Sequence, residues 1–315
     1  MDATRVGMIG TGWMAREHLR VIDGLDEAEL VAAADIDLSR AEAFVASSRA
    51  RAYQDWRELV DREDLDALFV CVPPAAHKAP VLEALSRRLP VYLEKPVARS
   101  LEDAAEIVEA AAAGGAICAV GYQWHALDIL EDLRRMLDDQ EIGLLVGTSV
   151  GPTESRPWFL ERSAGGGNLL ERGSHHIDLA RRVGGEVASA QAMAGSVRLA
   201  RSQGGGGDID DAVVITLELT SGAVANIVVA WTRPDQPGTY ALDVVATQAT
   251  LRLELDPDFK LCGTSKGDTV ALKSASHPLE ASQRSFFTAV ENRDPSLVAC
   301  TPADAARSLA VALAA

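Results

Sequence analysis

The stretch Arg5-Val6-Gly7-Met8-Ile9-Gly10-Thr11-Gly12-Trp13-Met14-Ala15 decides the fold. Residues 5–9 are short and apolar, which is typical of a buried parallel strand, and apolar residues at helical spacing follow as far as residue 22. A glycine turn between such a strand and helix lets backbone N–H groups and the helix N-terminus face an anion. The stretch therefore predicts a dinucleotide site, with the cofactor beside Gly10, Gly12, Trp13 and Met14.

A carboxylate stands where this kind of site needs one. The apolar run 29–34 ends in Asp35, twenty residues after Ala15. A dinucleotide fold places there the acid that binds both ribose hydroxyls of NAD, and that acid repels the 2′-phosphate of NADP. In the alternative, the glycines serve only the turn of an ordinary β-α-β unit. The common register of strand, turn, helix, second strand and acid favours NAD.

Length and composition restrict the class of protein. The 315 residues are enough for two domains, and 48% hydrophobic with 24% charged residues is a globular composition. Asp and Glu outnumber Lys and Arg by 46 to 30, which argues against nucleic-acid and anionic-membrane partners. The four cysteines lack paired spacing, so we expect no metal cluster and no disulfide framework. With no signal peptide or membrane span recognised, we expect a cytoplasmic protein.

Strand and helix patterns alternate over residues 1–121 and predict a Rossmann domain. This alternation implies an α/β fold, a doubly wound parallel sheet with helices on both faces. The expected strands are 5–9, 30–34, 67–72, 90–93 and 116–120, and the expected helices are 13–23, 38–47, 55–61, 75–88 and 101–113.

Two further strand ends belong to the expected ligand edge of this sheet. Ligands bind beyond the carboxyl ends of parallel strands. Val72 and Pro73 end one strand, and His77 follows at the start of the next helix, where we expect a surface or capping position. Glu94 and Lys95 end the next strand. We predict that all five residues border the cofactor and that Lys95 also contacts the substrate.

The pattern changes after residue 121, and residues 122–315 predict a second, α+β domain. Turn signals rather than crossover helices separate its apolar or alternating runs, so the sheet should be mostly antiparallel. The runs are 144–150, 190–199, 211–219, 223–231, 240–246 and 249–255, with helices over 126–138 and 303–315. Residues 227–231 are apolar on both faces, so we expect a partner subunit to cover the outer face.

The densest chemistry lies in the glycine-rich stretch 165–179. Glu171, His175 and Asp178 share one helix face if a helix begins by residue 171; alternatively, Ser174 caps a later helix and Glu171 lies in the turn. Either way a carboxylate lies near an imidazole, which favours a general base. Because His175 and the adjacent His176 point to different faces, we predict no metal site here.

Taken together, these motifs resemble the Gfo/Idh/MocA family, the glucose–fructose oxidoreductase and inositol dehydrogenase type. The motifs that carry the resemblance occur in the family's order over nearly the whole chain. They are the glycine turn 10–15, Val72-Pro73-Pro74-Ala75-Ala76-His77, Glu94-Lys95-Pro96, Gly121-Tyr122, and the glycine-rich stretch with His175-x-x-Asp178.

The resemblance implies a Rossmann domain followed by an open-faced sheet domain that binds substrate and joins subunits into homodimers or homotetramers. It implies a nicotinamide cofactor, NAD here, and a sugar, polyol or related hydroxy substrate. The family's catalytic lysine and histidine map onto Lys95 and His175, and its aspartate maps onto Glu171, which is one methylene longer.

The expected substrate region departs from the family pattern. The family often has Asn-Arg-Arg after Gly-Tyr, whereas this chain has Gln123-Trp124-His125. We place Gln123, Trp124, Arg156, Trp158 and Asp178 at the substrate, beside Lys95 and His175. Three functions follow from the resemblance: a dehydrogenase of a secondary alcohol, an NAD-binding sensor without turnover, and a lyase or hydrolase that uses bound NAD for transient oxidation. Because the chain keeps both Lys95 and His175, the prediction is the dehydrogenase.

Overall fold

A computed structural model describes residues 3–152, 156–197, 208–231 and 238–315. By their internal contacts the residues form two compact units. Unit 1 comprises Met1–Ala126 and Pro278–Ala306, and unit 2 comprises Leu127–His277 and Arg307–Ala315. Each unit contains one sheet, so each is described by itself.

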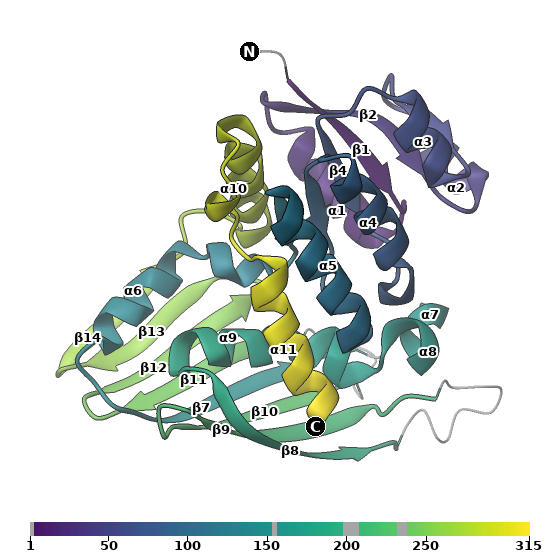
Figure 1. The fold of residues 1–315 in the computed structure, drawn as a ribbon. Coiled ribbons are helices and arrows are strands. Elements are labelled where there is room, and N and C mark those ends of the chain that lie inside the picture. Colours follow the sequence, from purple (N-terminus) through teal and green to yellow (C-terminus); the bar gives the residue numbers. More distant parts are fainter. Residues whose placement is uncertain (1–2, 153–155, 198–207, 232–237) are drawn as a thin grey trace. The chain divides into compact units, whose positions relative to one another are not determined.

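Unit 1 contains the predicted Rossmann sheet (Figure 1). Over the described residues its six strands are all parallel and follow the order β3-β2-β1-β4-β5-β6, which is the doubly wound arrangement. The strands are β1 (Thr4–Ile9), β2 (Ala28–Ala34), β3 (Arg51–Tyr53), β4 (Ala67–Val70), β5 (Val91–Leu93) and β6 (Cys118–Val120). The order reverses between β1 and β4, so a ligand crevice is expected beyond the carboxyl ends of these two strands.

Helices cover both faces of this sheet. They are α1 (Trp13–Ile22), α2 (Leu38–Val45), α3 (Trp56–Arg62), α4 (Lys78–Ser86), α5 (Leu101–Gly114) and α10 (Pro278–Asn292), with short turns η1 (Pro74–Ala76), η2 (Gln123–Ala126) and η5 (Pro295–Leu297). Side-chain caps begin several of them: Asp37 accepts from the Ser39 N–H before α2, and Ser100 accepts from the Asp103 N–H before α5. Helices α1, α2 and α10 share a core with one face of the sheet, and α3 and α4 pack on the other.

Helix α10 corrects the predicted division of the chain. The sequence prediction left every residue after 121 in the second domain, whereas residues 278–306 belong to unit 1. Phe286 and Phe287 of α10 pack against Phe69 of β4, with ring centroids 5.7 and 6.0 Å away, and Phe286 also contacts Tyr92 of β5. The chain therefore returns to unit 1 because one face of the parallel sheet needs an apolar cover.

Unit 2 is built on a larger sheet. Its eight strands, counted over the described residues, follow the order β14-β13-β12-β11-β7-β10-β9-β8, and every neighbouring pair is antiparallel except β7 with β10. The strands are β7 (Ile142–Val150), β8 (Val187–Gly195), β9 (Ala212–Leu219), β10 (Val224–Ala230), β11 (Thr239–Ala246), β12 (Ala249–Asp256), β13 (Lys260–Ser265) and β14 (Asp268–Lys273). The predicted mostly antiparallel sheet is confirmed.

One face of this sheet carries the helices of unit 2. Helix α9 (Ser174–Gly184) packs on β7 and β10, and α6 (Asp128–Leu137) packs on β13. The other helical segments are α7 (Pro157–Leu160), α8 (Arg162–Gly165), the π-helical turn η3 (Leu169–Gly173) and α11 (Pro302–Ala314), which begins in unit 1 and ends in unit 2. The side chains that alternate toward this face, such as Ile215, Ile227 and Val229, are fully buried.

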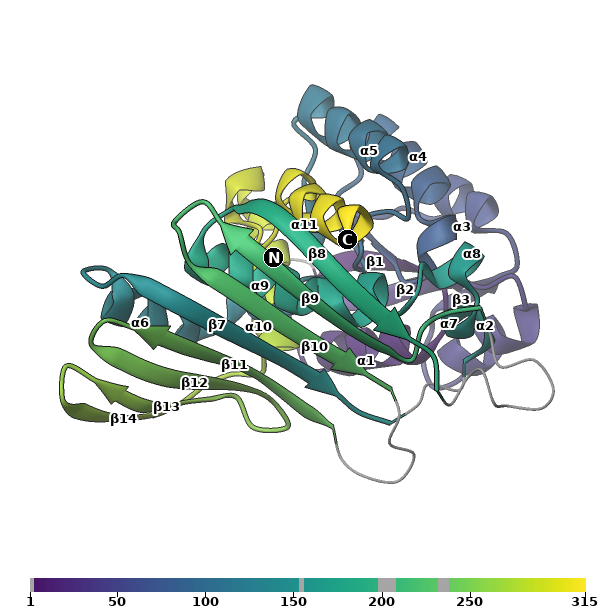
Figure 2. The ribbon, with the colours of Figure 1, turned by 90° about the horizontal axis from the view of Figure 1, so that it is seen from below.

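The opposite face of the sheet is open. Figure 2 shows the strands β7–β14 from this side with no described helix over them. Leu144 pairs with Val224 on one side and with Val245 on the other, so their side chains form an apolar row on this face. These three side chains are 38–41% exposed. An open face with exposed apolar residues of this kind was the expected feature of the second domain.

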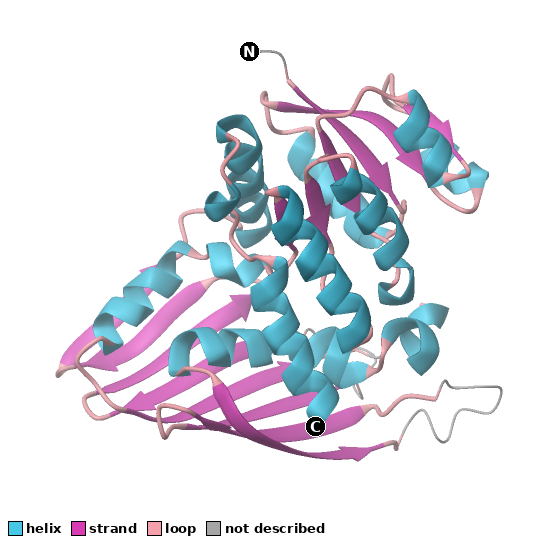
Figure 3. Cartoon of the chain, viewed as in Figure 1, coloured by secondary structure: helices cyan, strands magenta, loops and turns pink. Residues whose placement is uncertain are grey.

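Some elements were not predicted from the sequence; Figure 3 draws the observed helices in cyan and the strands in magenta. Strand β3 is three residues long and was not predicted. Strands β13 and β14 and helix α10 were not assigned either, because polar residues interrupt their apolar patterns. None of the helices within the described ranges is long and apolar enough to span a bilayer.

Candidate active site

The glycine turn between β1 and α1 has an open side and a closed side. Gly10 has φ +89°, and a Cβ added there would lie 2.4 Å from the Cys71 carbonyl oxygen. A Cβ on Gly12, by contrast, would meet no described atom within 4 Å, and no described side chain caps α1. The first-turn N–H groups of α1 can therefore approach a pyrophosphate, so the turn fits a dinucleotide. Trp13 is 60% exposed beside the turn and Met14 is half-buried.

Asp35 closes the same turn from the end of β2. Its Oδ2 accepts hydrogen bonds from the Thr11 N–H at 3.0 Å and from the Thr11 hydroxyl at 2.7 Å. Its Oδ1 accepts from the Asp37 N–H at 3.1 Å, and Arg40 lies 4.0 Å away. The carboxylate expected to bind ribose is thus already oriented by the glycine turn.

His77 connects the ends of two neighbouring strands. Its Nε2 lies 2.9 Å from the Val72 carbonyl oxygen, and its Nδ1 lies 3.0 Å from the Pro96 carbonyl oxygen. The side chain is fully buried, so the expected surface position is wrong, although His77 does occupy the N-cap position of α4. Burial lowers the pKa of His77, and the hydrogen bonds to the carbonyl oxygens oppose this shift only in part. Val72 and Pro73, in contrast, are half-buried.

Glu94 and Lys95 follow β5 at the carboxyl edge of the sheet. The Glu94 carboxylate is 6% exposed; its Oε1 lies 2.8 Å from His18 Nε2, and its Oε2 accepts from the Lys95 N–H at 3.1 Å. A Cβ on Gly121 would lie 2.9 Å from Oε1, so glycine is required for this close approach. Lys95 is half-buried. The Glu94 carboxylate therefore holds the main chain of Lys95 at the expected ligand edge.

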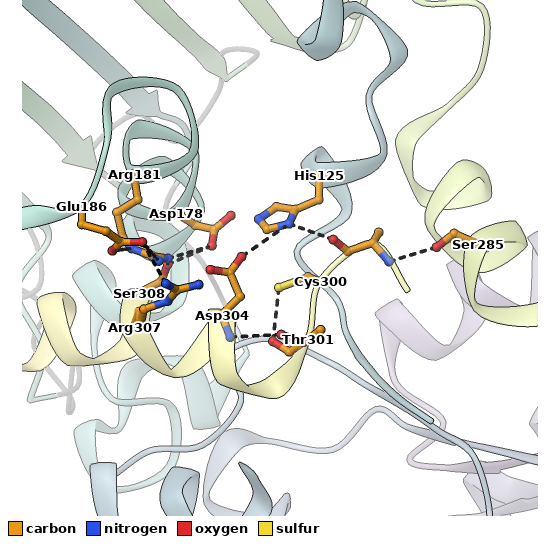
Figure 4. A network of polar contacts seen from close by, with 11 residues as sticks. His125, Asp178, Arg181, Glu186, Ser285, Cys300, Thr301, Asp304, Arg307 and Ser308 are labelled. Carbon is orange, nitrogen blue, oxygen red and sulfur yellow. Dashed lines mark hydrogen bonds and ion pairs between the residues drawn. The ribbon is translucent and has the colours of Figure 1, made fainter. Parts of the chain in front are cut away.

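The segment after Gly121 is anchored within unit 1. Gln123 is half-buried and Trp124 is 8% exposed in the short turn η2. His125 Nδ1 lies 3.0 Å from the Ala299 carbonyl oxygen and 3.8 Å from Asp304 Oδ2, and Figure 4 shows these contacts. His125 thus contacts the segment that follows α10.

From Leu169 onward, the glycine-rich stretch of unit 2 forms one continuous helical segment. Its first turn, η3, is π-helical, and α9 continues from it. Ser174 has helical dihedral angles, so the late-start alternative with a Ser174 cap is wrong. Glu171 and His175 lie four residues apart along this segment; Glu171 is buried and His175 is half-buried. π-helical turns often mark functional sites, because they re-aim side chains.

His176 and Asp178 lie inside unit 2. His176 is fully buried against β7, and a Cβ on Gly147 would lie 3.0 Å from its ring; burial lowers the pKa of His176 to about 4. Asp178, predicted to bind substrate, accepts from Ser308 at 2.8 Å and lies 3.6 Å from Arg181 (Figure 4). With 2% of its surface exposed, Asp178 joins α9 to the middle of α11 in this structure.

An aromatic cluster follows β7. Phe159 packs against Trp231, with ring centroids 5.3 Å apart, and Trp158 packs beside Phe159. Arg156 lies over the Phe159 ring at 4.3 Å. Trp158 and Arg156 are half-buried, so both predicted substrate residues belong to this cluster and keep part of their surface exposed.

Two family models match the chain, one to each unit. The model described as "Oxidoreductase family, NAD-binding Rossmann fold" matches residues 4–122, and the model described as "GFO/IDH/MocA C-terminal domain" matches residues 130–252. The chain belongs to the Gfo/Idh/MocA family. The cofactor of this family's Rossmann domain is NAD, in agreement with the glycine turn and Asp35 of this chain.

Several individual proteins are also similar to this chain. The uncharacterized oxidoreductase YrbE of Bacillus subtilis (strain 168) is 30% identical over 225 residues, 70% of this chain and 65% of its own length. A myo-inositol 2-dehydrogenase of Thermotoga maritima is 28% identical over 71% of this chain and 67% of its own length. Levoglucosan dehydrogenase, solved in complex with NADH, superimposes with a TM-score of 0.86 at 17% identity, over 99% of this chain and 95% of that one.

Two buried residues beside Glu94 were not predicted from the sequence. His18 lies in the middle of α1 and contacts Glu94, and Gln283 lies in α10 and contacts His18. A polar residue among the buried positions of α1 was the available signal for His18, because such a group needs a hydrogen-bonding partner. Gln283 carried no such signal, because α10 itself was not predicted.

Proposed function

We propose that this member of the Gfo/Idh/MocA family is an NAD-dependent dehydrogenase of a secondary alcohol in a sugar, polyol or related hydroxy compound. The supporting observation is that one chain holds an open dinucleotide turn, a lysine at the carboxyl edge of the Rossmann sheet, and Glu171 and His175 on either side of the junction between a π-helical turn and helix α9. The T. maritima relative named myo-inositol 2-dehydrogenase supports the substrate class. When bound, NAD supplies the hydride acceptor.

In this proposal three side chains of the protein act on the substrate hydroxyl. His175 accepts the hydroxyl proton as general base. Glu171, four residues earlier on the same segment, orients the imidazole and stabilises its protonated form. Lys95 holds the hydroxyl and stabilises the negative charge that develops on oxygen. Gln123, Trp124, Arg156 and Trp158 border the substrate, and Asp178 supports the helix that carries His175.

We propose a different binding role for each of the two domains. We assign dinucleotide binding to residues 1–121, together with the covering helix α10, and substrate binding to the domain that begins at residue 122. We further propose that the open face of the unit 2 sheet joins two copies of the chain, because Leu144, Val224 and Val245 otherwise expose an apolar row to water.

The deciding experiment is a panel of polyols, sugars and sugar acids with NAD, followed by the absorbance of the reduced cofactor. We expect turnover of at least one compound, and a loss on the order of 10²–10⁴-fold in kcat for His175→Ala. Lys95→Ala should be at least as severe, because it removes both a positioning contact and a positive charge. NADH affinity, measured by fluorescence, should change little in either variant.

Two results would contradict the proposal. NAD binding without turnover of any compound favours a sensor that only binds the cofactor. Turnover that survives both Lys95→Ala and His175→Ala at nearly the wild-type rate excludes the assigned roles.

A further inference from the structure

A buried series of side-chain hydrogen bonds ends at the main chain of Lys95. His18 of α1 and Gln283 of α10 are both fully buried. Gln283 Nε2 lies 2.9 Å from His18 Nδ1, and His18 Nε2 lies 2.8 Å from Glu94 Oε1. The other carboxylate oxygen of Glu94 accepts the Lys95 N–H at 3.1 Å. A residue 265 positions away from His18 thus connects, through two side chains, to the main chain of Lys95.

The hydrogen bonds assign the protons of this chain. Because the Gln283 amide donates to Nδ1 of His18, that nitrogen is an acceptor, and the imidazole proton is on Nε2. The Nε2–H then points at Glu94 Oε1.

The charge of Glu94 is retained despite its burial. Burial alone would raise the pKa of Glu94, but the hydrogen bond from His18, the charge of Lys95 and the hydrogen bond from the Lys95 N–H outweigh it, so the pKa is lowered. Burial raises the pKa of the neighbouring Cys71 thiol, and the negative charge of Glu94 raises it further. The close approach to Gly121 leaves no room for a Cβ on that side of the carboxylate.

We propose that His18 and Gln283 are positioning residues, which hold the Glu94 carboxylate against the Lys95 N–H and so fix the lysine for catalysis. The inference rests on the proposed function, in which Lys95 stabilises charge on the substrate oxygen. Reaction rates fall steeply when a catalytic group moves by as little as 1 Å, so a support that fixes the main chain next to the lysine affects kcat.

Two apolar substitutions and one rescue test this role. His18→Leu and Gln283→Leu should lower kcat by about 10- to 100-fold while the NADH dissociation constant stays near that of the wild type. His18→Gln retains a donor for Glu94, so it should recover part of the lost rate. The matched control is Tyr92→Phe, because the Tyr92 hydroxyl lies 2.9 Å from Ser282 Oγ and joins the same strand to the same helix without being part of the Glu94 chain.

Hydrogen exchange gives a readout that does not depend on turnover. The Lys95 amide should exchange about tenfold faster in His18→Leu and Gln283→Leu, because its hydrogen bond to Glu94 is weakened, and at the wild-type rate in Tyr92→Phe. Each variant is compared at an equal interval below its own Tm. Unchanged exchange at Lys95 in both Leu variants overturns the inference, whether or not a substrate has been found.

A double variant separates positioning from general destabilisation. In a Lys95→Ala background, His18→Leu should cause no further loss of kcat, because the residue acts through Lys95. A full additional loss in that background, equal to that in the wild type, also overturns the inference and leaves a structural role. If Lys95→Ala alone keeps the wild-type rate, the proposed function fails instead, and the exchange result still decides whether His18 and Gln283 hold this main chain.

Discussion

Gly10 and Cys71 lie against each other where β1 and β4 end, and a Cβ on Gly10 would come within 2.4 Å of the Cys71 carbonyl oxygen. This is the point at which the strand order of the Rossmann sheet reverses. Gly10 is therefore required by the fold, whereas a Cβ added to Gly12 would meet no described atom within 4 Å, and we propose that Gly12 serves the ligand instead.

The two glycines should accordingly respond differently to the same substitution. Gly10→Ala should lower the free energy of unfolding by at least about 1–3 kcal/mol, because φ is +89° and the methyl group meets a backbone carbonyl. Gly12→Ala should leave the unfolding free energy within about 0.5 kcal/mol of the wild type and weaken NADH binding at least tenfold. Urea unfolding and fluorescence titration measure the two quantities, and equal NADH affinity in Gly12→Ala and the wild type would contradict the assigned contact.

Asp35 should set the preference for NADH over NADPH. The wild type should bind NADH more tightly, because a carboxylate at the ribose repels a 2′-phosphate. Asp35→Asn keeps an oxygen acceptor for the Thr11 N–H but removes the charge, so the ratio of the NADPH to the NADH dissociation constant should fall. Asp37→Asn is the control, since Asp37 caps α2 at the surface. Tighter NADPH than NADH binding by the wild type would refute the prediction.

Glu171→Gln should act through His175. The substitution preserves side-chain size and removes the anionic neighbour that favours a protonated imidazole. The acidic limb of the pH–rate profile should therefore move to lower pH, while the NADH dissociation constant stays unchanged. A profile that keeps its acidic limb in place would assign Glu171 a different role.

His176 should make unit 2 sensitive to acid. Its pKa falls from 6.5 to about 4 on folding, so between these values the unfolded chain binds more protons. The contribution of neutral, buried His176 to the unfolding free energy is fully present above pH 6.5 and is lost as the pH falls toward 4, a change of about 3 kcal/mol. His176→Gln, which cannot titrate, should show a smaller loss of unfolding free energy between pH 7 and 4 than the wild type. If chemical denaturation shows that the wild type and His176→Gln lose the same unfolding free energy between these two pH values, the assignment is contradicted.

The open face of the unit 2 sheet should be the subunit contact. Val224→Asp introduces a charge into the apolar row beside Leu144, where the side chain is already 40% exposed, so the fold should tolerate it and the oligomer should not. Light scattering should show a homodimer or homotetramer for the wild type and a monomer for Val224→Asp. Leu297→Asp, at a 41% exposed position of unit 1, is the control. A monomeric wild type at micromolar concentration would exclude this contact.

Local patterns determined much of this protein. The glycine turn, the acid at Asp35, the lysine after a buried strand and the spacing of Glu171 and His175 are all short-range features. A period of 2 or 3.6 residues and the chemistry of a turn specify such features, because they depend on neighbours only a few positions away. The Rossmann sheet and the mostly antiparallel sheet could be predicted for the same reason.

Only the tertiary structure decided which distant residues support the site. His18 is buried in α1, and no residue close to it in the sequence indicates that Glu94 is its partner. Gln283 comes from a helix that was not predicted, among residues expected to belong to the second domain. Helix α10 packs on an apolar face of the parallel sheet in unit 1, and this packing places Gln283 beside His18. A buried polar group pairs with whatever donor or acceptor the packing places beside it, so its partner is settled when the core forms.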